Sequence, residues 1–164
     1  MKAIILAAGY ATRLYPLTKN FPKPLLEIGG KTILDYLVEQ LRDIPDIDQV
    51  HLVSNSRFVH HFQDWLTSLG DRAKQEDRAH RGLRITIHDD GTSSAEERIG
   101  AIRDIKVPID NAGLDDDLLV IASDNILQWS LNDFVKTWKR NGACLLYTSP
   151  SPRDRSLSRM PSSA

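Results

Sequence analysis

The chain has 164 residues, of which 41% are hydrophobic, and a formal net charge of -1 at pH 7. Its length is enough for one domain with a hydrophobic core, and its near-neutral charge argues against nucleic acid or an anionic membrane as a partner, because both attract a basic excess. The sequence contains no apolar run long enough to cross a bilayer and no signal-peptide pattern at its amino terminus. Its single cysteine excludes an internal disulfide. We therefore expect a cytoplasmic protein.

Strands and helices alternate along the first half of the chain. Residues 2–6, KAIIL, form a short apolar run followed by small residues, which is typical of a buried strand. Residues 7–31 form a loop rich in Gly, Pro and Thr, and loops of this length are uncommon in compact domains unless they have a function. Residues 32–43 predict a helix capped by its first threonine, residues 50–54 predict a second strand, and the apolar stripe within 58–69 predicts a second helix.

The alternation continues in the second half. LRITIH at 83–88 predicts a third strand, and Ser94 with Glu97 has capping-box spacing, which predicts a third helix at roughly 95–105. DDDLLVIASDN at 115–125 predicts a strand that ends in polar residues. A fourth helix is indicated by the apolar stripe of Leu131, Phe134, Val135 and Trp138. Strands that alternate with helices predict an α/β fold with a mostly parallel, doubly wound sheet and helices on both faces.

Residues 144–164 break this pattern. The segment CLLYTSPSPRDRSLSRMPSSA contains six serines, three prolines and three arginines without apolar periodicity, as a disordered tail would. Back-translation offers a sharper explanation, because codons for residues 144–154 and 158–164 match, in one frame, the two sides of a transposon-based sequencing adapter. We therefore predict that 144–164 is a disordered, non-native tail, and that 1–143 is an amino-terminal part of a longer natural protein.

The loop at 7–31 carries two cations in a restrained setting. The small residues AAG at 7–9 let a ligand approach main-chain N–H groups. Arg13 offers a planar guanidinium suited to phosphate. Lys23 stands between two prolines, and the second favours an extended backbone at the lysine. Either cation alone would be an ordinary surface charge, but the combination predicts an anion site.

Polar residues follow the strand LLVIA near the end of the chain. In parallel sheets, ligands bind beyond the carboxyl ends of the strands. If the first and fourth predicted strands are neighbours, Asp124 faces the same crevice as Arg13 and Lys23. An aspartate can also end a strand simply to start a turn. Its position opposite a basic loop favours a metal-binding role.

The spacing G-x-x-T-R-L-x-P-L-T-x-x-x-P-K-P-L-L, which begins at Gly9, resembles the signature of the sugar-1-phosphate nucleotidylyltransferases, or nucleotide-sugar pyrophosphorylases, a family that includes glucose-1-phosphate thymidylyltransferase. DGT at 90–92 and ASDN at 122–125 extend the resemblance over most of residues 1–143. The resemblance implies a GT-A-type, Rossmann-like fold, truncated at the carboxyl end. It also implies Mg²⁺-dependent transfer of NMP from an NTP to a sugar 1-phosphate, with release of pyrophosphate and formation of an NDP-sugar.

The resemblance also implies roles for residues that match the motifs. Arg13 and Lys23 are the catalytic candidates, because they would bind the phosphates during transfer, and Asp124 matches a Mg²⁺ ligand. The nucleotide-binding candidates are Ala8, Gly9, Tyr10, Thr12, Gly91 and Thr92. The acceptor pocket and a second metal-binding aspartate would lie beyond Ala143, so we expect the chain to be inactive alone.

This chain departs from the family pattern in two places. Ala8, Tyr10 and Ala11 stand where the family usually has glycine, and Tyr10 is expected to pack over the nucleotide. The segment TIHDD before Gly91 lacks the glutamine or glutamate that often reads the base.

Two other functions remain open. The same loop would serve a cytidylyltransferase that acts on phosphocholine or another alcohol phosphate. It would also serve a non-catalytic nucleotide-binding module, although retention of both cations and the carboxylate argues against this. The expected partners are an NTP and a sugar 1-phosphate, and homo-oligomerisation of the full-length protein is left open.

Overall fold

The computed structural model of the chain describes residues 1–75 and 82–141. The predicted non-native tail, 144–164, lies outside these residues. The described residues divide into two units, one that spans Met1–Asn132 and a second that begins at Asp133. The sheet and the predicted site residues all belong to the first unit.

A four-stranded parallel sheet forms the centre of this unit, in the order β5-β4-β1-β6. Its strands are β1 (Lys2–Leu6), β4 (Gln49–Ser54), β5 (Arg84–Asp89) and β6 (Leu118–Ala122). β1 is an inner strand, and its residues Ala3, Ile4 and Ile5 are fully buried, as its continuous apolar sequence predicts. All four predicted strands and their parallel arrangement are therefore confirmed.

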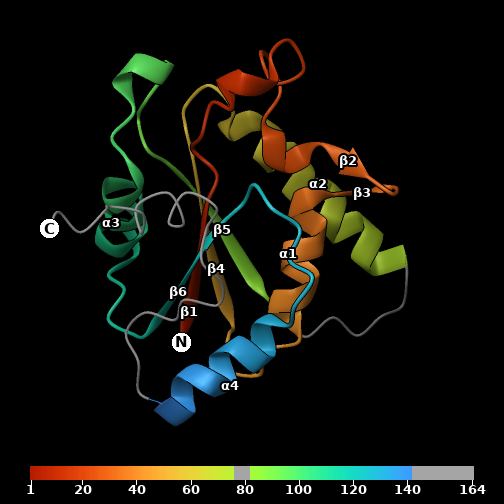
Figure 1. The fold of residues 1–164 in the computed structure, drawn as a ribbon, viewed down its shortest axis with the longest axis vertical. Helices are drawn as coiled ribbons and strands as arrows, with labels where there is room; N and C mark the ends of the chain where they lie inside the picture. Colours follow the sequence, from red (N-terminus) through yellow and green to blue (C-terminus); the bar gives the residue numbers. More distant parts are fainter. Residues whose placement is uncertain (76–81, 142–164) are drawn as a thin grey trace, which may run out of the picture. The chain divides into compact units, whose positions relative to one another are not determined.

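Helices cover both faces of this sheet. Figure 1 shows α1 (Ile33–Arg42) and α2 (Val59–Gln75) on one side of the strands and α3 (Ala101–Ala112) on the other. The chain steps from β1 to β4 to β5 in one direction and then crosses back to β6. Because crossovers between parallel strands are right-handed, this reversal places α3 on the opposite face. The predicted doubly wound arrangement is confirmed.

The long loop between β1 and α1 contains short elements that the sequence pattern does not predict. These are two 3₁₀ turns, η1 (Thr12–Leu14) and η2 (Lys23–Leu25), and a small antiparallel hairpin of β2 (Glu27–Ile28) and β3 (Lys31–Thr32). The expected extended backbone at Lys23 is wrong, because Lys23 is the first residue of η2. The extended conformation falls on Pro22 instead, with φ -74° and ψ 135°.

The predicted third helix is present between β5 and β6, but its expected start at 95 is wrong, because α3 spans Ala101–Ala112. Only Ala95–Glu97 form a 3₁₀ turn, η3, and the Ser94 side chain makes no capping hydrogen bond. Gly100 then takes φ 84°, which interrupts any right-handed helix at that point. The helix α3 begins after this glycine and continues to Ala112. By contrast, α4 (Leu131–Asn141) confirms the predicted fourth helix, and no helix in the described parts of the chain is long and apolar enough to cross a membrane.

A buried carboxylate joins α1 to α2. Asp35 completes the capping box with Thr32, since the Thr32 hydroxyl accepts from the Asp35 N–H and Asp35 accepts from the Thr32 N–H, each at 3.0 Å. Asp35 also accepts from Trp65 Nε1 at 3.0 Å and pairs with Arg72 at 3.0 Å. Burial alone would raise the pKa of Asp35, but the hydrogen bonds from Arg72, Thr32 and Trp65 outweigh it and hold the pKa below its usual value.

Two histidines lie on the α3 side of the sheet. His51 of β4 and His88 of β5 are buried, and their Nδ1 and Nε2 atoms are 2.9 Å apart. Such a bond needs one nitrogen to donate and the other to accept, so it fails when both rings are protonated. Burial lowers the pKa of both imidazoles, and the charges of His88 and Lys2 lower that of His51 further.

Replacing Asp35 tests its structural role. Asp35→Ala removes the acceptor of the Trp65 indole and half of the capping box, so we expect the free energy of unfolding to fall by about 2–3 kcal/mol. Urea denaturation followed by circular dichroism measures this. Asp43→Ala, at the exposed carboxyl end of the same helix, should change stability by less than about 0.5 kcal/mol. Equal effects of the two variants would contradict the role given to Asp35.

The histidine pair predicts a loss of stability in acid. Because the pKa of both rings lies below 6.5 in the folded chain, the unfolded chain binds more protons as the pH falls below 6.5, and the free energy of unfolding decreases. The double variant His51→Leu/His88→Leu should show a shallower decrease than the wild type in urea denaturation between pH 7.5 and pH 5, with exposed His60→Gln as the control. Parallel pH profiles for the wild type and the double variant would refute this prediction.

Candidate active site

A crevice of about 740 Å³ lies at the carboxyl ends of β1 and β6. It is lined by the loop after β1, by η2, by Arg98 and the first turn of α3, and by the end of β6 with the residues that follow it. This is the edge at which parallel sheets bind ligands. Of the predicted site residues, the crevice brings together Ala8, Gly9, Tyr10, Thr12, Arg13, Lys23 and Asp124.

Gly91 and Thr92 do not line this crevice. Thr92 is buried, its hydroxyl donates to Asp90 at 2.8 Å, and Tyr10 Oη lies 3.2 Å from the same hydroxyl. Gly91 is exposed and has φ 82°, so this turn needs glycine for its backbone conformation. Through the contact of Thr92 with Tyr10, this turn supports the loop after β1, although it does not line the crevice.

Tyr10 lies in the floor of the crevice. Only 2% of its surface is exposed, and its ring centroid is 6.1 Å from that of Phe58. The side chain therefore fixes the loop against the core, and the expectation that it packs over a nucleotide stays a prediction.

Side chains at the ends of neighbouring strands hold the loop in place. Asn55, fully buried after β4, donates from Nδ2 to the Ala8 carbonyl at 3.0 Å. Ser123, after β6, donates from Oγ to the Leu6 carbonyl at 2.7 Å. Sequence reasoning missed Asn55, although a polar residue directly after a buried strand is a signal that could have identified it.

The path of the loop depends on one unusual residue. Ala11 has φ 46° and ψ 41°, the left-handed conformation, which costs a non-glycine residue about 1–2 kcal/mol. The Thr18 hydroxyl donates to the Ala11 carbonyl at 2.8 Å, and the Leu14 N–H donates to the same oxygen at 2.9 Å. These bonds stabilise the turn that leads into η1 and Arg13.

Lys23 and Asp124 face each other across the crevice. The Lys23 Nζ is 3.5 Å from Asp124 Oδ2, and 27% and 54% of their side chains are exposed. An ion pair with exposed side chains and a 3.5 Å separation contributes little to stability. Lys23 and Asp124 can therefore separate and bind ligands at a small cost in free energy. This contact confirms the expectation that the basic loop and the acidic strand end share one crevice.

The donor set at Asp124 fits magnesium. Mg²⁺ is usually held by one or two carboxylates, with substrate phosphates and water completing the octahedron. Asp124 supplies such a carboxylate at the crevice, and the described residues hold no cluster of three or more His, Cys, Asp or Glu that would form a closed metal cage. Asp124 Oδ1 also accepts from the Asn125 amide at 2.7 Å, which orients the carboxylate.

Two charged residues that sequence reasoning missed also line the crevice. Arg98 is exposed, and its Nε donates to the Ala95 carbonyl at 2.6 Å. Asp104, in the first turn of α3, has its Oδ1 shielded from water. Burial and the charge of Asp90 raise the pKa of Asp104 to about 6. Arg98 falls in the part of the predicted helix that the structure does not form, whereas Asp104 lies in α3 and belongs to no motif that marks it as a crevice residue.

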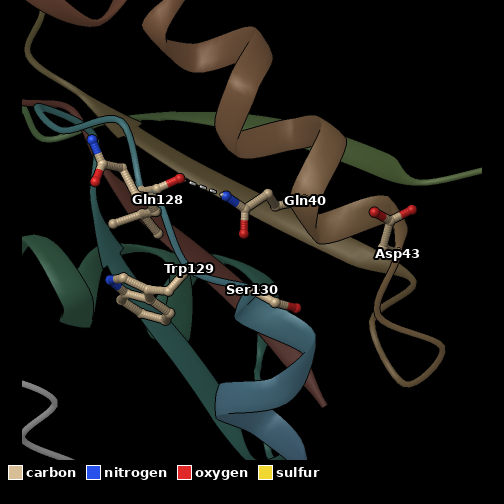
Figure 2. A pocket seen from close by; sticks show the side chains of 6 residues that line it. Gln40, Asp43, Gln128, Trp129 and Ser130 are labelled. Atoms are coloured by element: carbon tan, nitrogen blue, oxygen red, sulfur yellow. Dashed lines mark hydrogen bonds between the residues drawn. The ribbon is translucent and has the colours of Figure 1, made fainter.

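A smaller hollow of about 210 Å³ lies between the end of α1 and the segment after β6. Figure 2 shows Gln40 reaching from α1 toward this segment, where its Nε2 donates to the Leu127 carbonyl at 3.1 Å. The Gln40 Oε1 accepts from the Leu131 N–H at 3.0 Å. Gln40 therefore fixes the chain as it leaves β6 and starts α4.

Comparison with known proteins agrees with this geometry. A UTP–glucose-1-phosphate uridylyltransferase of Haloferax volcanii is 30% identical over 145 residues, which cover 87% of this chain and 51% of that protein. A probable mannose-1-phosphate guanylyltransferase of Oryza sativa is 29% identical over 150 residues, covering 87% of this chain and 36% of that protein.

Solved structures show the same fold. A Bacillus anthracis protein described as a glucose-1-phosphate thymidylyltransferase superposes with a TM-score of 0.65 and 28% identity, over 85% of this chain and 50% of that one. A UDP-glucose pyrophosphorylase with bound UDP-glucose superposes with a TM-score of 0.66 at 19% identity, over 86% of this chain and 54% of that one, and supports the Rossmann-like α/β fold alone. The chain thus spans about half, or less, of the length of these relatives.

The family model for nucleotidyl transferases matches residues 2–156. The match includes part of the segment 144–164, whose non-native origin stays a prediction. With the crevice, the fold and this match in agreement, the chain belongs to the nucleotidyl transferase family.

Proposed function

We propose that the protein transfers a nucleoside monophosphate from an NTP to a sugar 1-phosphate, with release of pyrophosphate and formation of an NDP-sugar. The observation that carries this proposal is the position of Lys23 opposite Asp124, in one crevice with Arg13. Cations that bind phosphate and a carboxylate suited to Mg²⁺ are the parts that phosphoryl and nucleotidyl transfer require.

The reaction needs no protein nucleophile. A phosphate oxygen of the sugar phosphate attacks the α-phosphorus of the NTP, the bond from that phosphorus to the bridging oxygen breaks, and pyrophosphate leaves. Arg13 and Lys23 bind the phosphates and offset the negative charge that develops on them. Mg²⁺ held by Asp124 would supply further charge neutralisation. The contribution of this chain is to hold the reactants in line and to place fixed charges around them.

The relatives support a sugar 1-phosphate as the acceptor. The Haloferax and Oryza proteins are described as acting on glucose 1-phosphate and mannose 1-phosphate. A cytidylyltransferase for phosphocholine would need the same phosphate loop, so the loop alone does not distinguish the two.

Replacing Lys23 tests the mechanism. In the full-length protein, Lys23→Ala should lower kcat by about 100- to 1,000-fold, because a fixed cation at the transferring phosphate is lost. Pyrophosphate release under saturating substrates measures this change. The control is Lys19→Ala, an exposed lysine of the same loop that does not line the crevice. A Lys23→Ala enzyme with unchanged kcat would rule out the proposed role.

A panel of acceptors tests the reaction class. With a mixture of NTPs and Mg²⁺, pyrophosphate release by the full-length protein should require a sugar 1-phosphate and should be absent with phosphocholine. Release with phosphocholine alone would identify the cytidylyltransferase instead. Tight NTP binding without release for any acceptor would identify a non-catalytic binding module. The 164-residue chain serves as a further sample, which we expect to give no turnover.

A further inference from the structure

Arg57 is an exposed cation outside the crevice that bonds to the loop after β1. It lies two residues before α2, and this part of the chain stands beside the loop at one end of the sheet (Figure 1). Its Nη2 donates to the Lys19 carbonyl at 2.7 Å and to the Asn20 side-chain oxygen at 3.1 Å. The guanidinium therefore joins the start of α2 to a loop segment 37 and 38 positions earlier in the sequence.

The loop segment 12–21 depends on this connection because it has little support of its own. Of its residues only Thr18 is buried. Its backbone hydrogen bonds, such as that from the Lys19 N–H to the Pro16 carbonyl at 3.1 Å, stay within the loop. Among the described residues, the hydrogen bonds that reach this segment from outside the loop come from Arg57.

Arg57 is itself held in a restricted direction. Its guanidinium carbon lies 5.5 Å from the ring centroid of Phe58, a core residue with 2% of its surface exposed. A guanidinium stacked on an aromatic ring in this way is attracted to the ring and keeps its donors in a fixed plane. The Phe58 N–H in turn donates to Oδ1 of the buried Asn55 at 3.0 Å. The support of the loop by Arg57 therefore originates in the core.

Hydrogen bonds continue from the Arg57 contact to the catalytic candidate Arg13. Thr18, the residue before Lys19, donates from its hydroxyl to the Ala11 carbonyl at 2.8 Å. Ala11 is the residue from which η1 starts, and η1 carries Arg13 to the crevice. A restraint on Lys19 is thus transmitted through Thr18 to the base of the turn that presents Arg13.

We propose that Arg57 is a positioning residue that holds the loop segment 12–21 and so keeps Arg13 at the crevice during nucleotidyl transfer. This rests on the proposed function, in which Arg13 binds the phosphates. Arg57 acts through Arg13 and does not contact the substrate. Its loss leaves the Arg13 side chain present but less well placed, and a cation that must reorganise offsets developing charge less effectively.

Hydrogen–deuterium exchange of the 164-residue chain tests the support of the loop without reference to activity. Arg57→Met keeps an apolar stem against Phe58 but removes the donors. Amides in a peptide that covers 12–21 should exchange about tenfold faster in this variant, because the segment opens more often. Arg84→Met, at the amino end of β5 and so away from the crevice, is the control and should leave this peptide unchanged.

A second variant tests the same contact from the other side. Asn20→Ala removes one of the two acceptors and leaves α2 intact, so exchange in the same peptide should rise by a smaller factor than in Arg57→Met. Thermal unfolding establishes that each variant is folded. Unchanged exchange of 12–21 in folded Arg57→Met or Asn20→Ala would overturn the inference and leave the proposed function intact.

A double-mutant cycle in the full-length protein tests the action through Arg13. Pyrophosphate release under saturating substrates should show kcat about 10- to 100-fold lower for Arg57→Met, with a smaller change in KM, because a positioned cation is displaced. In an Arg13→Ala background the same replacement should change kcat by less than about twofold. Arg57→Lys, whose ammonium again supplies donors, should recover part of the lost kcat.

The outcomes of the cycle separate the two proposals. A loss from Arg57→Met that persists in full when Arg13 is absent would show that Arg57 does not act through Arg13, and would overturn the inference alone. A wild type that releases no pyrophosphate with any acceptor would overturn the proposed function, and the role of Arg57 in transfer with it.

Discussion

The parallel pairing of β1 with β6 brings the basic loop and the acidic strand end together. Leu6 lies opposite Ala122 in this pairing, and Ser123 bonds to the Leu6 carbonyl through both its N–H and its hydroxyl. The segments that follow β1 and β6 therefore leave the sheet side by side. Lys23 and Asp124, which are 101 positions apart in sequence, consequently come within 3.5 Å. Without this pairing the cations would face solvent, and the carboxylate would only end a strand.

Asp35, Asp124 and Asp104 differ in how their carboxylates are bonded. Asp35 is buried and receives hydrogen bonds from three neighbours, so it stabilises the packing of α1 on α2. Asp124 is half exposed, with a long contact to Lys23, and Asp104 has a shielded oxygen without a donor among the described residues. The shielded Asp104 oxygen costs stability because no donor satisfies it, whereas the exposed Asp124 carboxylate can give up its long contact with Lys23 at small cost. Their presence in one crevice is the pattern expected of a site that a ligand completes.

Strain is also concentrated at this crevice. Ala11 adopts the left-handed conformation that glycine would take without cost, and three surrounding features compensate: the bonds from Thr18 and Leu14 and the buried anchor of Tyr10. The turn gives η1 a fixed starting direction and so presents Arg13 to the crevice. On the opposite side, η2 packs against α1 through buried Pro24 and Leu25, which fixes the base of Lys23. Rigid supports of this kind limit the reorganisation needed when charge develops on a phosphate.

The sequence by itself determined the main strands and helices of the fold and the charged residues Arg13, Lys23 and Asp124 of the crevice. Apolar runs and stripes placed all four strands and the helices α1, α2 and α4, because local periodicity reflects burial directly. The spacing from Gly9 to Lys23 identified the basic loop, and the strand end identified Asp124. Local patterns failed where a single backbone angle decided the outcome: Gly100 delayed the start of the helix expected at 95–105, and Arg98 falls in the part that does not form a helix. Only the tertiary structure decided that β6 lies beside β1, that Thr92 contacts Tyr10 of the loop after β1, and that Asp104 lines the crevice, since each depends on contacts between segments distant in sequence, which no local pattern encodes.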